Sequence, residues 1–205
     1  METLQNTELK NIINNSLENA ISYHDYRELV IDLVSKESTT GVEKNEALAN
    51  YTMLNDRRMK RWDKTVKVSE AAQHKISTLK TNQTWLVLTE SWCGDAAHLM
   101  PVMNKVAGLN NNINFKVVLR DENQALMNAF LTNGGQAIPK LIMIDNDTNE
   151  VINTFGPRPT EATKLVNDYK AEHGALTPEF KEDLQGWYNK NKGQNAIDDL
   201  VNLMH

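Results

Sequence analysis

The sequence predicts an α/β fold in which a mixed β-sheet is flanked by helices, with further helices added at both ends. Residues 85–90 and 113–121 are short runs rich in β-branched and apolar residues. A helical stretch over 94–109 separates them, an order typical of parallel strands joined by a right-handed crossover. Two later runs, 139–145 and 150–155, are joined by the short polar link NDTN. So short a link favours an antiparallel hairpin.

The first 80 residues are expected to be helical because their apolar residues recur at three- and four-residue spacing. One such face begins at Leu9 and a second at Tyr23, and the second helix should end near the turn-prone STTG at 38–41. A third helix is expected over 44–62. Ser69 is a suitable N-cap for a fourth, alanine-rich helix.

After the second strand, the pattern predicts a helix over 122–131, a turn at the NGG of 133–135, and three closing helices at 160–173, 178–189 and 195–204. The domain organisation expected from this order is a helical extension over 1–80, a central α/β domain over 81–172 and a C-terminal helical extension over 173–205. These parts are expected to pack as one unit.

Composition excludes several classes of protein. A net charge of −5 argues against nucleic acid as a partner, and the basic run at 57–67 is interpreted as a solvated helix face in preference to a phosphate- or acidic-partner patch. The sequence offers neither a secretory signal nor an apolar run long enough to span a membrane. A single cysteine forms no internal disulfide, which suits a reducing compartment, so the cytoplasm is expected. We expect no cofactor.

Four landmarks occur in a fixed order along the central part of the chain. They are WCGDA at Trp92–Ala96, Pro101 eight residues after the cysteine, the pair Ile138-Pro139, and Gly156 after the last strand. With these landmarks, residues 81–172 resemble the thioredoxin family, which implies a thioredoxin-like fold. Further stretches, such as LTNGGQAIPKLI around Pro139 and the closing WYNKNKGQ, are similar to a bacterial thioredoxin-like branch with the same WCGDA motif.

The resemblance implies that Cys93 is the nucleophile and that Pro139 is a cis-proline facing it. A sulfur at a helix start meets unpaired N–H groups and the positive end of the helix dipole, which favour thiolate. The polar backbone groups of Ile138 would then be free to pair with an extended peptide. The implied substrate groove is formed by these neighbours of the sulfur: Trp92, Gly94, Ala96, Ile138, Pro139 and Gly156.

Two departures from the family pattern narrow the chemistry. Ala96 stands where thioredoxins have the resolving cysteine, and Val87 stands where they have a buried acid. A mixed disulfide at Cys93 could therefore not be released within the same monomer. Asp95 favours the helix start but disfavours a nearby thiolate, and helix capping is preferred over a direct chemical role.

Other polar residues near the motif have two interpretations each. Glu90 could act as an acid or base towards Cys93, but an exposed glutamate at the strand end is preferred. His98 is interpreted as a surface or packing histidine, and no metal site is expected. Residues 120–122, Arg-Asp-Glu, are interpreted as a capped helix start with a surface ion pair. Trp92 serves equally well as a groove wall or a packing residue.

Three functions fit these residues. The first is a monothiol protein that exchanges disulfides through Cys93 with a protein or small-molecule thiol, using an external thiol to resolve the product. The second is a peptide- or protein-binding module without catalysis. The third, a small-thiol or iron-sulfur carrier like monothiol glutaredoxins, is disfavoured by Asp95 and Ala96. Trp62, Trp187 and Tyr188 are expected to be buried against the core, with a homodimer as the alternative.

Overall fold

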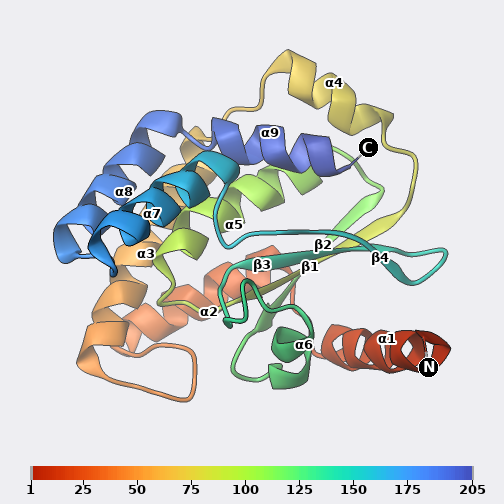
Figure 1. Cartoon of the computed structure of the whole chain (residues 1–205), viewed down its shortest axis with the longest axis horizontal. Helices are drawn as coiled ribbons and strands as arrows, with labels where there is room; N and C mark the ends of the chain where they lie inside the picture. Colours follow the sequence, from red (N-terminus) through yellow and green to blue (C-terminus); the bar gives the residue numbers. More distant parts are fainter. Residues whose placement is uncertain (1, 205) are drawn as a thin grey trace.

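The computed structural model describes residues 2–204, with side chains from residue 6 onward. Its sheet has the strands β1 (Gln83–Thr89), β2 (Ile113–Leu119), β3 (Lys140–Asp145) and β4 (Glu150–Phe155). The strand order is β2-β1-β3-β4 (Figure 1). β1 and β2 are parallel, and β3 is antiparallel to both of its neighbours. The predicted α/β class with a mixed sheet is confirmed.

The helices of the described residues lie close to where the apolar spacing predicts them. They are α1 (Glu2–Glu18), α2 (Tyr23–Ser35), α3 (Glu46–Thr65), α4 (Glu70–Thr78), α5 (Gly94–Ala107), α6 (Gln124–Ala129), α7 (Thr160–His173), α8 (Pro178–Asn191) and α9 (Gln194–Leu203). None of them, within residues 2–204, combines the length and apolar character needed to cross a membrane.

The central strand β1 is buried along its whole length because both of its edges are paired and both of its faces are covered. α5, α9 and α4 lie on one side of the sheet, and α1 and α6 lie side by side on the other (Figure 1). The isolated bridge Ile21↔Val117 ties the segment between α1 and α2 to the outer edge of β2. The apolar runs of the sequence therefore form one core.

The added helices α3 and α8 are packed against α5, the helix that follows Cys93. Trp62 of α3 is 3% exposed and Tyr188 of α8 is 2% exposed. Both rings contact His98 of α5. Burial against the core, predicted from the sequence for Trp62, Trp187 and Tyr188, is confirmed for Trp62 and Tyr188, whereas Trp187 is only half-buried. The N-terminal and C-terminal helical additions thus both contact α5.

Candidate active site

Cys93 lies at the end of the loop after β1 and is the residue that immediately precedes α5. It is 8% exposed, and its Sγ donates a hydrogen bond to the carbonyl oxygen of Ile138 at 3.2 Å. The Ile138-Pro139 peptide bond is cis. The Ile138 N–H makes no hydrogen bond within residues 2–204. One polar group of Ile138 is therefore occupied by the thiol, while the other is free.

The electrostatic surroundings of the sulfur favour the neutral thiol. Burial is the largest cause and the Asp95 charge the second, and together they raise the pKa of Cys93 to about 12. The backbone N–H groups of Ala96 and Asp95 and the charge of Arg158 lower that pKa, but by less. The N–H groups at the start of α5 thus lower the pKa of Cys93, as expected, but burial raises this pKa by more.

Asp95 does not cap α5, contrary to the interpretation preferred from the sequence. Its carboxylate forms an ion pair with Arg158 at 2.6 Å and accepts a hydrogen bond from the Tyr188 hydroxyl at 3.0 Å. The side chain is drawn away from the helix because these two partners supply a cation and a donor that free N–H groups cannot match. Burial raises the pKa of Asp95, and Arg158 and Tyr188 oppose that rise.

His98 belongs to a buried stack that continues from Tyr188. The two rings are stacked with their centroids 4.3 Å apart, and His98 Nε2 lies 2.6 Å from Gln185 Oε1. Trp62 packs edge-on against the same imidazole. Burial lowers the pKa of His98 to about 4, so the ring is neutral at physiological pH. Of the two roles expected for His98, surface or packing residue, the structure shows the packing role.

The prediction that Glu90 is an exposed strand-end residue is wrong. Its side chain is fully buried, and its Oε1 accepts a hydrogen bond from the Asp121 N–H at 2.9 Å. The physical reason is the segment 39–42 between α2 and α3, which folds over the end of β1. Burial raises the pKa of Glu90, and the hydrogen bond from the Asp121 N–H opposes that rise.

Segment 39–42 is held by hydroxyl groups on loop 90–93, which connects β1 to α5 and carries Cys93. The Ser91 hydroxyl lies 3.1 Å from Thr39 Oγ1, 3.1 Å from Thr40 Oγ1 and 2.8 Å from Thr52 Oγ1. Asn55 adds a hydrogen bond from its amide to the Ser91 carbonyl at 2.9 Å. The turn-prone STTG, predicted only to end a helix, therefore also positions the residues just before Cys93.

Residues 120–122 do not form the capped helix start and surface ion pair that the sequence suggests. Arg120 and Asp121 are ion-paired at 2.8 Å, but their side chains are only 20% and 15% exposed. α6 begins later, at Gln124. The ion pair is shielded because Arg120 lies over the Trp92 ring at 5.0 Å and Asp121 accepts the N–H of Val42 at 3.0 Å. Trp92 itself is half-buried.

Of the remaining residues predicted to form a groove, Ile138 contacts the thiol and Gly156 lies against Pro139. Ile138 and Ala96 are buried at 6% and 1% exposure. Gly156 has φ +104°, and a Cβ at this position would overlap the carbonyl oxygen of Pro139. A glycine is therefore required where the chain after β4 passes the proline loop. Gly94, the first residue of α5, faces Arg58 and Gln185.

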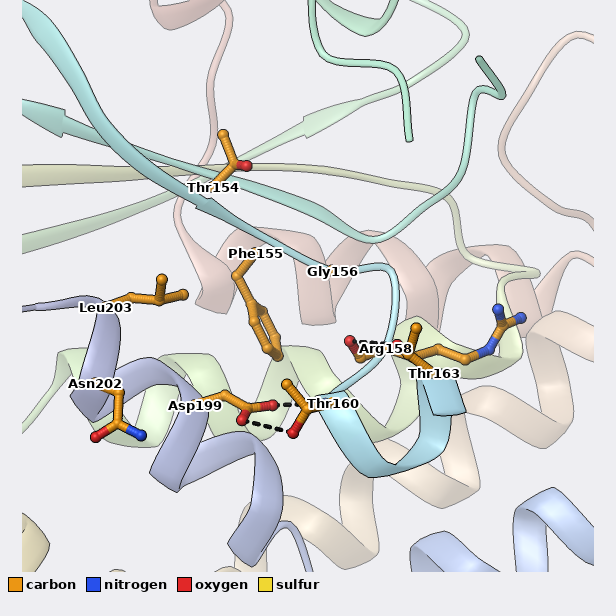
Figure 2. A pocket seen from close by; sticks show the side chains of 9 residues that line it. All are labelled: Thr154, Phe155, Gly156, Arg158, Thr160, Thr163, Asp199, Asn202 and Leu203. Atoms are coloured by element: carbon orange, nitrogen blue, oxygen red, sulfur yellow. Dashed lines mark hydrogen bonds between the residues drawn. The ribbon is translucent and has the colours of Figure 1, made fainter. Parts of the chain in front are cut away.

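A hollow of about 490 Å³ lies beside Gly156, between the end of β4, α7 and α9. Figure 2 shows its lining, with the Arg158 guanidinium at the opposite end from Asn202 and Leu203. Asp199 of α9 accepts hydrogen bonds from the Thr160 N–H and hydroxyl at 2.7 and 2.9 Å. It thereby satisfies the start of α7, whose preceding residue, Pro159, has no capping side chain. The hollow and the Cys93 site share Arg158 and Gly156.

Replacing Glu90 by Gln tests the buried carboxyl. A carboxyl whose pKa is raised on folding stabilises the fold below its unfolded pKa, and that contribution is lost as pH rises through the folded pKa. The advantage of Glu90→Gln over the wild type in free energy of unfolding should therefore grow from pH 4 to pH 8. Urea unfolding across this range measures it. Parallel stability curves for the two proteins would contradict the burial of an ionisable group here.

Fold and site together define a protein of the thioredoxin-like class, with a cysteine at a helix start facing a cis-proline. A family model described as thioredoxin matches residues 41–170, more than half of the chain. The chain therefore belongs to the thioredoxin family.

Two solved structures share the fold at low sequence identity. A protein of unknown function from Pseudomonas aeruginosa is 15% identical with a TM-score of 0.57, over 76% of this chain and 89% of that one. An HIV epitope scaffold is also 15% identical, with a TM-score of 0.58, over 76% of this chain and 90% of that one. No curated protein matches the sequence.

Proposed function

We propose that the protein is a monothiol member of its family that takes part in thiol-disulfide exchange through Cys93. The observation that carries this proposal is the placement of the sulfur. Cys93 Sγ lies against the Ile138 carbonyl, and the free Ile138 N–H beside it offers a pairing point for an extended substrate. Ala96 supplies no second sulfur, so an external thiol must complete the reaction.

The exchange proceeds in two balanced steps. The Cys93 thiolate attacks one sulfur of a substrate disulfide, the substrate S–S bond breaks, and the released thiolate leaves with the electron pair and takes up a proton. An external thiolate then attacks the substrate sulfur of the mixed disulfide and forms a new disulfide with it. The bond to Cys93 breaks, and Cys93 leaves as a thiolate that takes up a proton and becomes the thiol again. No net oxidation of the protein results. The raised pKa of Cys93 makes the first step slow near neutral pH, and a bound partner that displaces the Sγ to Ile138 hydrogen bond would help to expose the sulfur.

The second candidate is a binding module that holds a peptide without covalent chemistry. Its specific support is the same raised pKa of Cys93, together with the burial of the sulfur. In that case the cysteine would be a packing residue, and the free Ile138 N–H would serve recognition alone. The two candidates differ in whether capture depends on sulfur.

Trapping with tagged protein separates them. Because no resolving cysteine is present, the wild type should accumulate reductant-sensitive mixed disulfides at Cys93, and Cys93→Ser should accumulate none. Non-reducing electrophoresis followed by mass spectrometry of the adducts measures this. If Cys93→Ser captures the same partners as the wild type, exchange is refuted and the binding module is supported.

Finer assignments complete the proposal. We place the chain in a bacterial branch of thioredoxin-like proteins because it carries the WCGDA motif. We place its reaction in the reducing cytoplasm because a lone thiol needs reduced thiols for its second step. We assign no cofactor, nucleic acid or membrane to its reaction. Sedimentation with and without reductant tests the homodimer in which two Cys93 residues pair.

A further inference from the structure

Three of the six arginines have no carboxylate partner among the side chains of residues 6–204, and all three lie on α3. Arg27, Arg120 and Arg158 form ion pairs. Arg57 and Arg61 are exposed, and Arg61 donates a hydrogen bond to Asn189. Arg58 is half-buried and forms no ion pair among the side chains that the structure describes. Burying a guanidinium without a counter-charge costs free energy, so the surroundings of Arg58 show what could offset that cost.

Arg58 lies beside the residue that follows Cys93. A methyl group added to Gly94 would be 3.9 Å from Arg58 Nη1 and 4.0 Å from Gln185 Nε2. The guanidinium is held by a hydrogen bond from Nη1 to Asn55 Oδ1 at 3.0 Å, and Asn55 in turn binds the Ser91 carbonyl. The loop that carries Cys93 and the side chain of Arg58 are thus fixed to each other by one buried amide.

The second polar group beside Gly94, the side-chain amide of Gln185, is also a hydrogen-bond donor. Gln185 uses its carbonyl oxygen towards His98, and its Nε2 has no partner among the described residues. The neighbouring acid cannot neutralise Arg58, because Asp95 is already paired with Arg158 and Tyr188. Burial and the like charge of Arg61 both lower the pKa of Arg58, as expected for a cation that lacks a partner. The surroundings of Gly94 therefore present positive charge and an N–H donor.

We propose that Arg58 and Gln185 form a carboxylate-binding subsite beside Cys93, which selects small thiols or disulfides that carry a free carboxylate. The inference rests on the proposed exchange reaction and names its substrate class. A planar guanidinium with an adjacent amide donor suits the two oxygens of a carboxylate. A small molecule fits better than an acidic protein surface because the donors lie one residue from the nucleophile.

Alkylation of Cys93 by two reagents of similar size tests this subsite. Iodoacetate carries a carboxylate and iodoacetamide does not, so the ratio of their rates reports the subsite and cancels any change in the pKa of the thiol. We expect Arg58→Gln to lower the iodoacetate rate about five- to tenfold relative to iodoacetamide. Arg58→Lys should keep part of the preference, and Arg57→Gln, an exposed arginine of the same helix, should leave the ratio unchanged.

An unchanged ratio in Arg58→Gln, or an equal fall in Arg57→Gln, would overturn the subsite. Raising the salt concentration should reduce the wild-type ratio only modestly, because a half-buried pair is screened less than exposed charges. Exchange with dithiodipropionate and with the neutral hydroxyethyl disulfide then separates the two proposals. If neither disulfide reacts, exchange fails, while the iodoacetate ratio still decides the subsite.

Discussion

Asp95→Asn is expected to make Cys93 react about tenfold faster with iodoacetamide at pH 8. The Asp95 charge is the second-largest cause of the raised pKa of Cys93, after burial. Removing that charge also leaves the positive charge of Arg158 unopposed near the sulfur, which favours thiolate further. The pH profile of the alkylation rate, followed by mass spectrometry, should shift to lower pH. A profile identical to that of the wild type would show that the Asp95 charge does not reach the sulfur.

Asp95→Asn removes the shielded ion pair between Asp95 and Arg158. The unpaired Arg158 is expected to lower the free energy of unfolding by about 3 kcal/mol. The double variant Asp95→Asn/Arg158→Gln removes both charges and serves as the control. Because Asp95 raises the pKa of Cys93 by more than Arg158 lowers it, the double variant should still react faster than the wild type. Thermal unfolding of each variant verifies that the measured protein is folded.

Gly156→Ala is expected to lower the free energy of unfolding by about 3 kcal/mol or more. The added Cβ would overlap the carbonyl oxygen of Pro139, and the backbone at φ +104° disfavours any side chain. Because the overlap is with backbone, it is relieved only by moving the proline loop away from Cys93. Urea unfolding measures the loss, and alkylation of Cys93 should become faster if the loop moves.

Two other glycines provide matched controls. Gly134 has φ +77° with nothing within 4 Å of an added Cβ, so Gly134→Ala should show the conformational cost alone, about 1 kcal/mol. Gly186 lies within α8 at an ordinary helical φ and also has open space, so Gly186→Ala should stabilise the protein by about 1 kcal/mol. Equal losses in Gly156→Ala and Gly134→Ala would contradict the close approach to Pro139.

The strands and helices could be predicted because their signals are local. Ser69 does cap α4, accepting a hydrogen bond from the Ala72 N–H, as its position before an alanine-rich run suggests. The hairpin of β3 and β4 follows from the length of its polar link. Cys93, Ile138, Pro139 and Gly156 could be named because the landmarks of a thioredoxin-like chain stand in order. In the structure the Cys93 sulfur contacts Ile138, and Gly156 lies against the carbonyl of Pro139.

The sequence by itself determined the fold class, the single nucleophile and the absence of a second cysteine at Ala96, since each depends on residues read in place along the chain. Only the tertiary structure decided the environment of that nucleophile. Arg158, Tyr188 and Arg58 reach the start of α5 from separate elements, and segment 39–42 buries Glu90. Burial and charge depend on distance in space, and so the raised pKa of the thiol at Cys93 followed from packing that no local pattern encodes.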